Sequence, residues 1–255
     1  MSFSISTREC WFMQSRQKPH ARLRLFCFPY AGGGASLFRR WSEHLPDEVD
    51  VCPVQLPGRE NRRKEAPFTQ IQPLIETLVD VFVPYMDMPF AFFGYSLGAL
   101  IGFELARQLR SQKRAGLLHL FVAGRKAPQI LRREAPMSVL SDEAFIEVLR
   151  TFQGTPEEVL RNTELMRLFL PLLRADFAIY ESYTYTAEAP LECAISAFGG
   201  IDDCKVAMSD LLAWKDQTID AFTLRMFPGD HFFLSGNETA LLQLVSRELN
   251  ALLCF

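Results

Sequence analysis

The sequence predicts an α/β protein with a mostly parallel sheet flanked by helices. Short apolar runs alternate with helical patterns along the chain, and several runs are almost unbroken in hydrophobic residues. Such an alternation is typical of a parallel sheet with right-handed crossovers. The chain has 255 residues, 49% of them hydrophobic, which is enough to bury the core of one large domain. We therefore expect a single domain over residues 1–255.

Six short apolar runs are the expected strands. A strand that is covered on both faces of a parallel sheet carries hydrophobic residues at nearly every position. The runs cover residues 23–28, 49–54, 90–93, 119–122, 193–198 and 222–227.

Three segments between or after these runs carry a helical pattern. The clearest covers residues 69–85, where apolar side chains recur at i, i+3 and i+4 on one face. A second helix is expected from Leu97 to about Leu109, and a third from about Thr239 to Leu253.

Residues 138–185 interrupt the alternation, because they carry helical patterning without a strand. Ser141, followed by two acidic residues, predicts a capped helix start. Residues 157–180 are rich in apolar side chains, and Gly154, Pro156 and Pro171 punctuate the pattern. The segment is either a set of extra helices that complete the core or a helical lid inserted over a cleft. We favour the lid because of its position relative to the motif described next.

The sequence GYSLG at residues 94–98 matches the G-x-S-x-G motif in the expected context, with an apolar strand before it and a helix after it. In the α/β-hydrolase fold this serine sits on a tight strand-to-helix turn that projects its hydroxyl. We therefore expect an α/β-hydrolase with Ser96 as nucleophile. The N–H of Leu97, at the start of the helix, is expected to donate to an oxyanion. A glycine-rich turn with an incidental serine is the less favoured interpretation, since it leaves that context unexplained.

The loop after the first strand is the expected second half of an oxyanion hole. It reads PYAGGG at residues 29–34, and consecutive glycines let the backbone approach a substrate closely. The loop has neither G-K-[ST] nor G-x-G-x-x-G, so it does not match a phosphate-binding loop. The N–H of Ala31 is the expected second donor.

His231 stands where a general base is expected. The order along the chain in this fold is nucleophile, acid, histidine. His20 and His44 precede Ser96, and His119 opens an expected strand. His231 follows the last expected strand and precedes the last helix, a position above the carboxyl end of the sheet. The alternative is an incidental loop histidine.

Two neighbouring residues are candidates for the acid. The strand at 193–198 runs into GGIDDCKV at residues 199–206, which offers Asp202 and Asp203. Either carboxylate could accept from the histidine Nδ1–H and hold its tautomer. Asp230 adjoins His231, and adjacent side chains rarely face each other, so we expect Asp230 to fix the loop.

Charge, hydropathy and cysteine content indicate which partners and which cellular compartment to expect. The formal net charge is −3 with the basic residues scattered, which argues against binding to nucleic acid or an anionic membrane. No window approaches 18 apolar residues, and residues 1–22 lack the apolar stretch of a signal peptide. The six cysteines show no C-x-x-C pair or zinc spacing, so we expect no metal site, and a reducing cytoplasm is the default. Cys27, Cys52 and Cys193 are expected to be small buried hydrophobes.

Several blocks resemble the type II thioesterases, the stand-alone enzymes that accompany nonribosomal peptide synthetases and modular polyketide synthases. The blocks are LFCFPYAGGGAS at 25–36, QLPGRE at 55–60, FGYSLGA at 93–99, PLLRAD at 171–176 and PGDHFF at 228–233. They occur in order and at spacing similar to that family, and together they span most of the chain.

The resemblance implies hydrolysis of acyl thioesters on the phosphopantetheine arm of a carrier protein, which removes stalled or aberrant acyl groups. The family's acid lies in a block like G-x-x-D-P-x-V, followed by Ala-Trp. That block places the acid at Asp203, with Ala213 and Trp214 downstream. Cys204 replaces the usual proline, so Asp202 stays a reserve candidate.

The implied partners are acyl or peptidyl carrier protein domains of a synthase. No cofactor of its own is expected, because the substrate is carried on the partner's phosphopantetheine, and nothing in the sequence requires more than a monomer. Two other classes stay open. One is a general carboxylesterase or lipase, which shares the triad but needs no carrier; the other is a non-catalytic module that binds carrier proteins.

Overall fold

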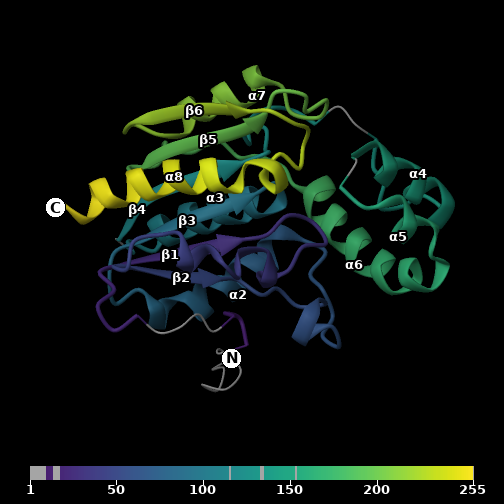
Figure 1. The fold of residues 1–255 in the computed structure, drawn as a ribbon, viewed down its shortest axis with the longest axis horizontal. Coiled ribbons are helices and arrows are strands. Elements are labelled where there is room, and N and C mark those ends of the chain that lie inside the picture. Colours follow the sequence, from purple (N-terminus) through teal and green to yellow (C-terminus); the bar gives the residue numbers. More distant parts are fainter. Residues whose placement is uncertain (1–9, 14–17, 115, 133–134, 153, 255) are drawn as a thin grey trace.

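A computed structural model describes residues 10–13, 18–114, 116–132, 135–152 and 154–254. In this described part, one parallel sheet forms the centre of the protein, with the strand order β2-β1-β3-β4-β5-β6 (Figure 1). The strands are β1 (Leu23–Phe28), β2 (Val49–Pro53), β3 (Phe90–Tyr95), β4 (Leu117–Ala123), β5 (Ala194–Gly200) and β6 (Phe222–Phe227). Every neighbouring pair is parallel. The predicted fold class is confirmed.

Helices cover both faces of this sheet. Side chains alternate along each strand, so that Phe26 and Phe28 of β1 join one buried cluster while Leu25 and Cys27 join the other. The first cluster packs against α2 (Ile71–Phe82), α3 (Leu97–Ser111), α7 (Met208–Leu212) and the 3-10 turn η5 (Ala213–Gln217). The second packs against α8 (Leu234–Leu253) and the 3-10 turns η1 (Ala35–Phe38) and η2 (Trp41–Glu43). Both faces are therefore buried, which is why the strands carry so few polar residues.

The predicted helices are present, with shifted ends. The segment expected at 69–85 consists of α2 followed by the 3-10 turn η4 (Val83–Tyr85). α8 begins at Leu234, five residues before the expected start, but Asn237 has non-helical torsion angles (φ −129°, ψ 17°). The regular helix thus begins after Asn237, close to the expected Thr239. Cys27, Cys52 and Cys193 are buried as predicted, and burial raises the pKa of the Cys193 thiol to about 12.

Three helices lie between β4 and β5, in the stretch that interrupted the sequence pattern. They are α4 (Asp142–Phe152), α5 (Glu157–Arg161) and α6 (Thr163–Ser182). The Ser141 hydroxyl accepts from the Ala144 N–H at 3.3 Å, as predicted for a cap. Pro171 lies inside α6 rather than between helices. It is exposed, so the carbonyl that loses its donor there can bind water.

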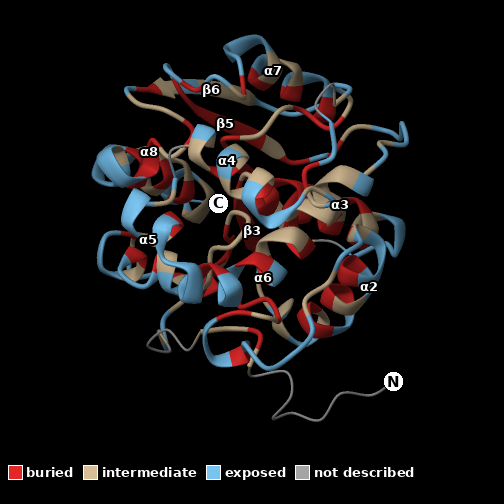
Figure 2. Cartoon of the chain, turned by 90° about the vertical axis from the view of Figure 1, so that its right-hand side faces the viewer, coloured by how far each residue is buried: buried red, intermediate tan, exposed pale blue. Residues whose placement is uncertain are grey.

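These helices have a small buried core of their own. It contains Phe145 and Leu149 of α4, Leu160 of α5, and Met166 and Leu170 of α6. In Figure 1 they lie beside the sheet rather than within its layers. Figure 2 faces this end of the molecule and shows exposed stretches on α5 and α6, with buried strands behind them. We call residues 138–185 the lid segment below.

Candidate active site

Ser96 lies on a tight turn between β3 and α3. Its backbone angles are φ 52° and ψ −107°, a region that costs a non-glycine residue about 1–3 kcal/mol. A Cβ at Gly94 would lie 2.3 Å from the carbonyl oxygen of Gly98, and one at Gly98 would lie 2.1 Å from that of Phe28. The Ser96 N–H donates to the Ala123 carbonyl at 2.8 Å. The turn is therefore fixed to the neighbouring strand, and both glycines of the motif are needed for its close approach.

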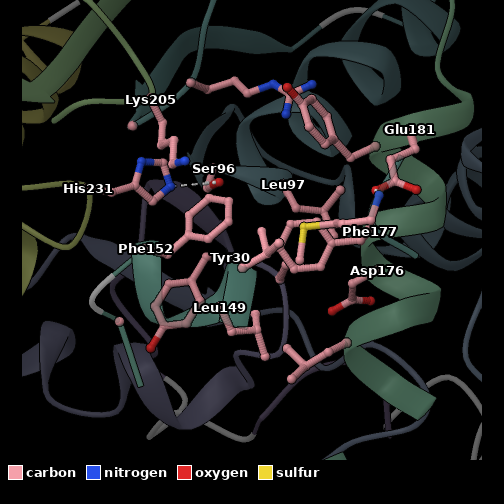
Figure 3. Close-up of a pocket in the computed structure, with 18 of the residues that line it drawn as sticks. Tyr30, Ser96, Leu97, Leu149, Phe152, Asp176, Phe177, Glu181, Lys205 and His231 are labelled. Carbon is pink, nitrogen blue, oxygen red and sulfur yellow. Dashed lines mark hydrogen bonds between the residues drawn. The ribbon is translucent and has the colours of Figure 1, made fainter. Parts of the chain in front are cut away.

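Ser96, His231 and Asp203 form a continuous chain of hydrogen bonds. His231 Nε2 lies 3.1 Å from Ser96 Oγ, and His231 Nδ1 lies 2.8 Å from Asp203 Oδ2. Figure 3 shows the imidazole turned toward the serine. His231 and Asp203 are both buried, at 8% and 9% exposed. This arrangement lets the imidazole take the serine proton while the carboxylate holds its tautomer.

The structure distinguishes the two candidate acids. Asp203 points one carboxylate oxygen at His231, and the other accepts from the backbone N–H groups of the residues two and three positions on, at 2.8 and 3.1 Å. Asp202 is exposed, and its carboxylate accepts instead from the Gly229 N–H at 3.3 Å. Asp203 thus occupies the acid position beside the imidazole, whereas Asp202 bonds the neighbouring loop.

Tyr95 contacts the histidine loop, a role that the sequence analysis missed. Its hydroxyl donates to the His231 carbonyl at 2.5 Å, and its ring is buried. Burial raises the pKa of Tyr95, so the hydroxyl keeps its proton and remains a donor. Asp230 accepts from the Phe232 N–H at 2.7 Å, as expected of a loop-fixing residue. The sequence alone could have indicated this role, because a tyrosine at the end of a buried strand needs a hydrogen-bond partner for its hydroxyl.

Both expected oxyanion donors belong to residues that line the same pocket as Ser96, namely Ala31 and Leu97. Leu97 is the first residue of α3, so its N–H has no partner within the helix. In the glycine loop, the Gly33 N–H donates to the Tyr30 carbonyl at 2.9 Å. A trans peptide points its C=O and N–H in opposite directions, so the Ala31 N–H faces away from this turn.

A cavity of about 320 Å³ lies between Ser96 and the lid segment. Figure 3 shows Leu149, Phe152 and Phe177 around the space beside Ser96. The part of the cavity wall that the lid segment supplies is mainly apolar, with Leu140, Val148, Leu149, Phe152, Leu173, Phe177 and Tyr180; it also includes Gly154, Thr155, Asp176 and Glu181. The site therefore combines a polarised hydroxyl with a mostly hydrophobic binding space, which suits an acyl group.

The described residues contain neither a cluster of metal-binding side chains nor a helix that could span a membrane. Within them, no three or more His, Cys, Asp or Glu side chains are grouped so that they could hold a metal ion. No helix in the same ranges has the length and apolar content to cross a membrane.

Comparisons with known proteins place this chain in a family. The family model described as Thioesterase domain matches residues 23–249. The gramicidin S biosynthesis protein GrsT of Aneurinibacillus migulanus is 47% identical over 98% of this chain and 97% of its own length. Thioesterase PikA5 of Streptomyces venezuelae is 38% identical over 88% of this chain and 80% of its own. The structure of BorB, a type II thioesterase from the borrelidin biosynthetic cluster, has a TM-score of 0.86 at 37% identity, over 94% of this chain and 98% of BorB. By sequence and by fold, this chain belongs to the thioesterase family.

Proposed function

We propose that this protein hydrolyses acyl thioesters on the phosphopantetheine arm of carrier protein domains and so removes stalled or aberrant groups in nonribosomal peptide or polyketide biosynthesis. The observation that carries the proposal is the hydrogen-bonded chain of Ser96, His231 and Asp203 beside an apolar pocket. The similarity to a gramicidin S biosynthesis protein and to a type II thioesterase supports the biosynthetic setting.

The first half of the reaction transfers the acyl group to the enzyme. Ser96 Oγ attacks the thioester carbonyl carbon while His231 Nε2 takes the hydroxyl proton, and Asp203 stabilises the imidazolium. The N–H groups of Ala31 and Leu97 bind the oxyanion, and one such donor contributes about 10²- to 10³-fold to the rate. The intermediate then breaks its C–S bond, and the pantetheine sulfur leaves as a thiol with the proton from His231.

The second half releases the acid. Water attacks the acyl-serine carbonyl while His231 takes its proton, and the same two N–H groups bind the second oxyanion. Collapse of this intermediate returns the proton to Ser96 Oγ and frees the carboxylic acid. Side chains, backbone and water supply every group in these steps, so the proposal includes no cofactor.

The lid segment acts in this proposal as the cover of the acyl site. Its apolar side chains, among them Leu149, Phe152 and Phe177, border the cavity beside Ser96. They shelter the acyl chain from water by contact rather than by hydrogen bonds, which suits an enzyme that accepts many acyl groups. We place the protein in the cytoplasm as a monomer that meets its carrier protein domains transiently.

Replacement of Ser96 tests the catalytic role. Ser96→Ala is expected to abolish hydrolysis of an acyl-pantetheine thioester while circular dichroism and Tm stay close to the wild type. A fluorophosphonate probe should label the wild type and leave S96A unlabelled, because only an activated serine reacts quickly. Hydrolysis that survives S96A, or a wild-type serine that resists the probe, would contradict the proposal and favour a non-catalytic binding module.

The carrier protein is tested by matched substrates. The same acyl group is offered on a phosphopantetheinylated carrier protein, on free pantetheine and as an oxygen ester. We expect kcat/KM to be highest for the carrier-bound thioester. Equal or higher kcat/KM for the oxygen ester would indicate a general carboxylesterase or lipase instead.

A further inference from the structure

A buried ion pair joins the lid segment to the glycine loop beneath the pocket. Arg59 lies in the loop between β2 and the 3-10 turn η3 (Glu60–Arg62), and Asp176 lies on α6. Arg59 Nη2 lies 2.8 Å from Asp176 Oδ1, and Arg59 Nη1 lies 3.0 Å from Asp176 Oδ2. The two side chains are only 4% and 1% exposed. The pair is therefore bidentate and almost completely removed from water.

Both partners of this pair also bind the backbone of the glycine loop. Asp176 Oδ2 accepts from the Gly32 N–H at 2.7 Å, and Arg59 Nη1 donates to the Gly33 carbonyl at 3.0 Å. A Cβ at Gly32 would lie 2.6 Å from Leu173 of α6, so the loop and this helix are in direct contact. One ion pair thus orients two peptide groups of the loop at once.

The orientation of these peptides bears on the oxyanion donor. Residues 30–33 form a hydrogen-bonded turn in which Gly32 has φ +79°, as in type II turns. If the peptide between Ala31 and Gly32 flipped, it would turn the Ala31 carbonyl toward the buried Asp176 carboxylate, which repels it. Asp176 therefore favours a single state of the turn and thereby fixes the adjoining peptide, whose N–H belongs to Ala31.

Stability alone is a weak explanation for such a pair. The cost of removing two charges from water offsets most of their attraction, so apolar residues of similar size often stabilise a fold equally well. The additional bonds to Gly32 and Gly33 are contacts that an apolar replacement would lack.

We infer that Asp176, with Arg59 as its countercharge, is a positioning residue for the oxyanion hole. Through it, the geometry of the Ala31 donor depends on the docking of α6 against the glycine loop. This inference rests on the proposed function, because it takes the Ala31 N–H as an oxyanion donor.

The test replaces Asp176 by its uncharged isostere. Asp176→Asn keeps the shape of the side chain but replaces the carboxylate that the Gly32 N–H and the Arg59 guanidinium bind with a neutral amide. We expect kcat on an acyl-pantetheine thioester to fall about 10- to 100-fold, since a displaced donor loses part of the effect of an absent one. KM should stay within about twofold, because the interaction acts on the transition state. The affinity for an alkyl boronate, whose tetrahedral adduct with Ser96 mimics the oxyanion, should fall with kcat.

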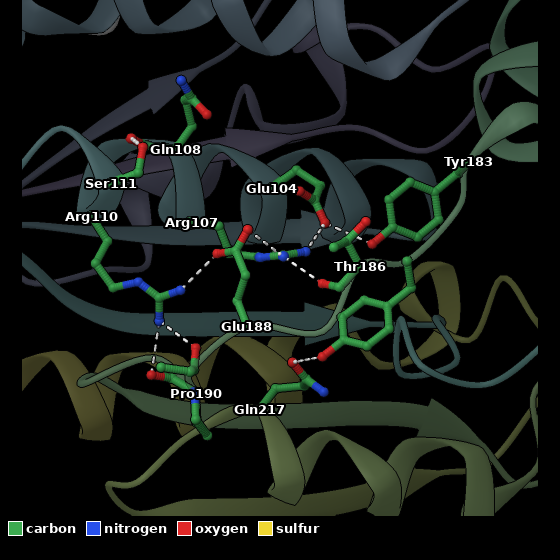
Figure 4. Close-up of polar contacts among 12 residues, drawn as sticks. Glu104, Arg107, Gln108, Arg110, Ser111, Tyr183, Thr186, Glu188, Pro190 and Gln217 are labelled. Atoms are coloured by element: carbon green, nitrogen blue, oxygen red, sulfur yellow. Dashed lines mark hydrogen bonds and ion pairs between the residues drawn. The ribbon is translucent and has the colours of Figure 1, made fainter.

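A second polar network provides the matched control. Glu104 of α3 accepts from Arg107 at 2.8 Å and from the Tyr183 hydroxyl at 2.6 Å, and Arg107 also donates to the Thr186 carbonyl and pairs with Glu188. Figure 4 shows this network, which holds the chain after α6 against α3. Among the described residues, the hydrogen bonds and ion pairs of Glu104 and Arg107 join these two residues to each other and to residues 183–188, not to the glycine loop or Ser96. Glu104→Gln should therefore lower Tm while kcat and boronate affinity stay within about twofold of the wild type.

Three results would overturn the inference. They are an unchanged kcat in D176N, a rise confined to KM, or a loss of kcat without a loss of boronate affinity.

If D176N does not fold, Arg59→Lys provides the same test, because lysine keeps the positive charge but cannot form the bidentate pair with Asp176. An unchanged kcat and an unchanged boronate affinity in R59K would equally overturn the inference. Hydrolysis by the wild type and its loss in S96A are measured in parallel, so failure of this inference is distinct from failure of the proposed function.

Discussion

The hydroxyl of Tyr95 donates a hydrogen bond to the backbone carbonyl of His231, across 136 positions of sequence. The residue before the proposed nucleophile, Ser96, thus holds the loop that carries the proposed general base, His231. Tyr95 is 1% exposed, and its partner carbonyl belongs to a residue that is itself 8% exposed. The distance between Ser96 and His231 therefore depends on a hydrogen bond that is shielded from solvent.

Removal of this hydroxyl should affect both catalysis and stability. Tyr95→Phe leaves the His231 carbonyl without this donor, which costs about 1–3 kcal/mol for a buried group. We expect a lower Tm and a kcat about 3- to 30-fold below the wild type, because the imidazole is less well placed. Steady-state kinetics and thermal unfolding measure the two effects. A kcat equal to the wild type in a folded Y95F would show that the loop is held by other contacts.

The two neighbouring aspartates should behave very differently. Asp203→Asn is expected to lower kcat on the order of 10³- to 10⁴-fold, because the amide stabilises the wrong histidine tautomer. Asp202→Asn is the matched control, since its carboxylate accepts from the Gly229 N–H and does not face the His231 imidazole, which bonds Asp203. It should keep kcat within about threefold of the wild type. An equal loss of kcat in D203N and D202N would contradict the assignment of Asp203, rather than Asp202, as the acid.

The motif glycine Gly98 should not tolerate a methyl group. In Gly98→Ala, the new Cβ would lie 2.1 Å from the Phe28 carbonyl oxygen, so the turn or β1 must move. We expect a loss of about 3 kcal/mol in the free energy of unfolding, at the upper end of the usual cost of an overpacked site. Urea denaturation measures it.

Gly236 is the control for this substitution, because a Cβ there meets nothing within 4 Å. Gly236→Ala, just before the kink at Asn237, should leave the free energy of unfolding unchanged or raise it by up to about 1 kcal/mol, because alanine restricts the unfolded chain more than glycine does. The G98A prediction is wrong if both variants unfold alike.

His119 should make stability depend on pH. Burial lowers the pKa of His119 from 6.5 to about 4, and the ring bonds Ser196 at 2.9 Å. The folded state thus favours the neutral ring, while the unfolded chain takes up a proton below pH 6.5. Its contribution is full above pH 6.5 and declines as the pH falls toward 4, by about 3 kcal/mol at most. Urea denaturation of the wild type and His119→Gln across this range measures the difference. It should shrink as the pH falls, and a constant difference would contradict the prediction.

The sequence predicted the sheet because strands that are buried on both faces carry continuous apolar runs. Ser96 and His231 were identifiable because one lies in a motif and the other remains after elimination. The choice between Asp202 and Asp203 needed the resemblance, since adjacent residues differ only in the direction that the backbone gives them. The pair of Arg59 and Asp176 has no local pattern, because its partners lie 117 positions apart. The contact of Tyr95 with His231 likewise depends on how the end of β3 meets the distant loop after β6.

The ion pair between Arg59 and Asp176 restricts how this enzyme can be re-engineered. An inserted helical segment that only rested on the sheet would be a module, open to exchange between homologues in order to change substrate range. Here the insertion contributes a carboxylate to the loop that follows β1, and the arginine that neutralises it comes from a third part of the chain. In a chimaera, the insertion should therefore be transferred together with Arg59 and with Gly32 and Gly33 of the glycine loop.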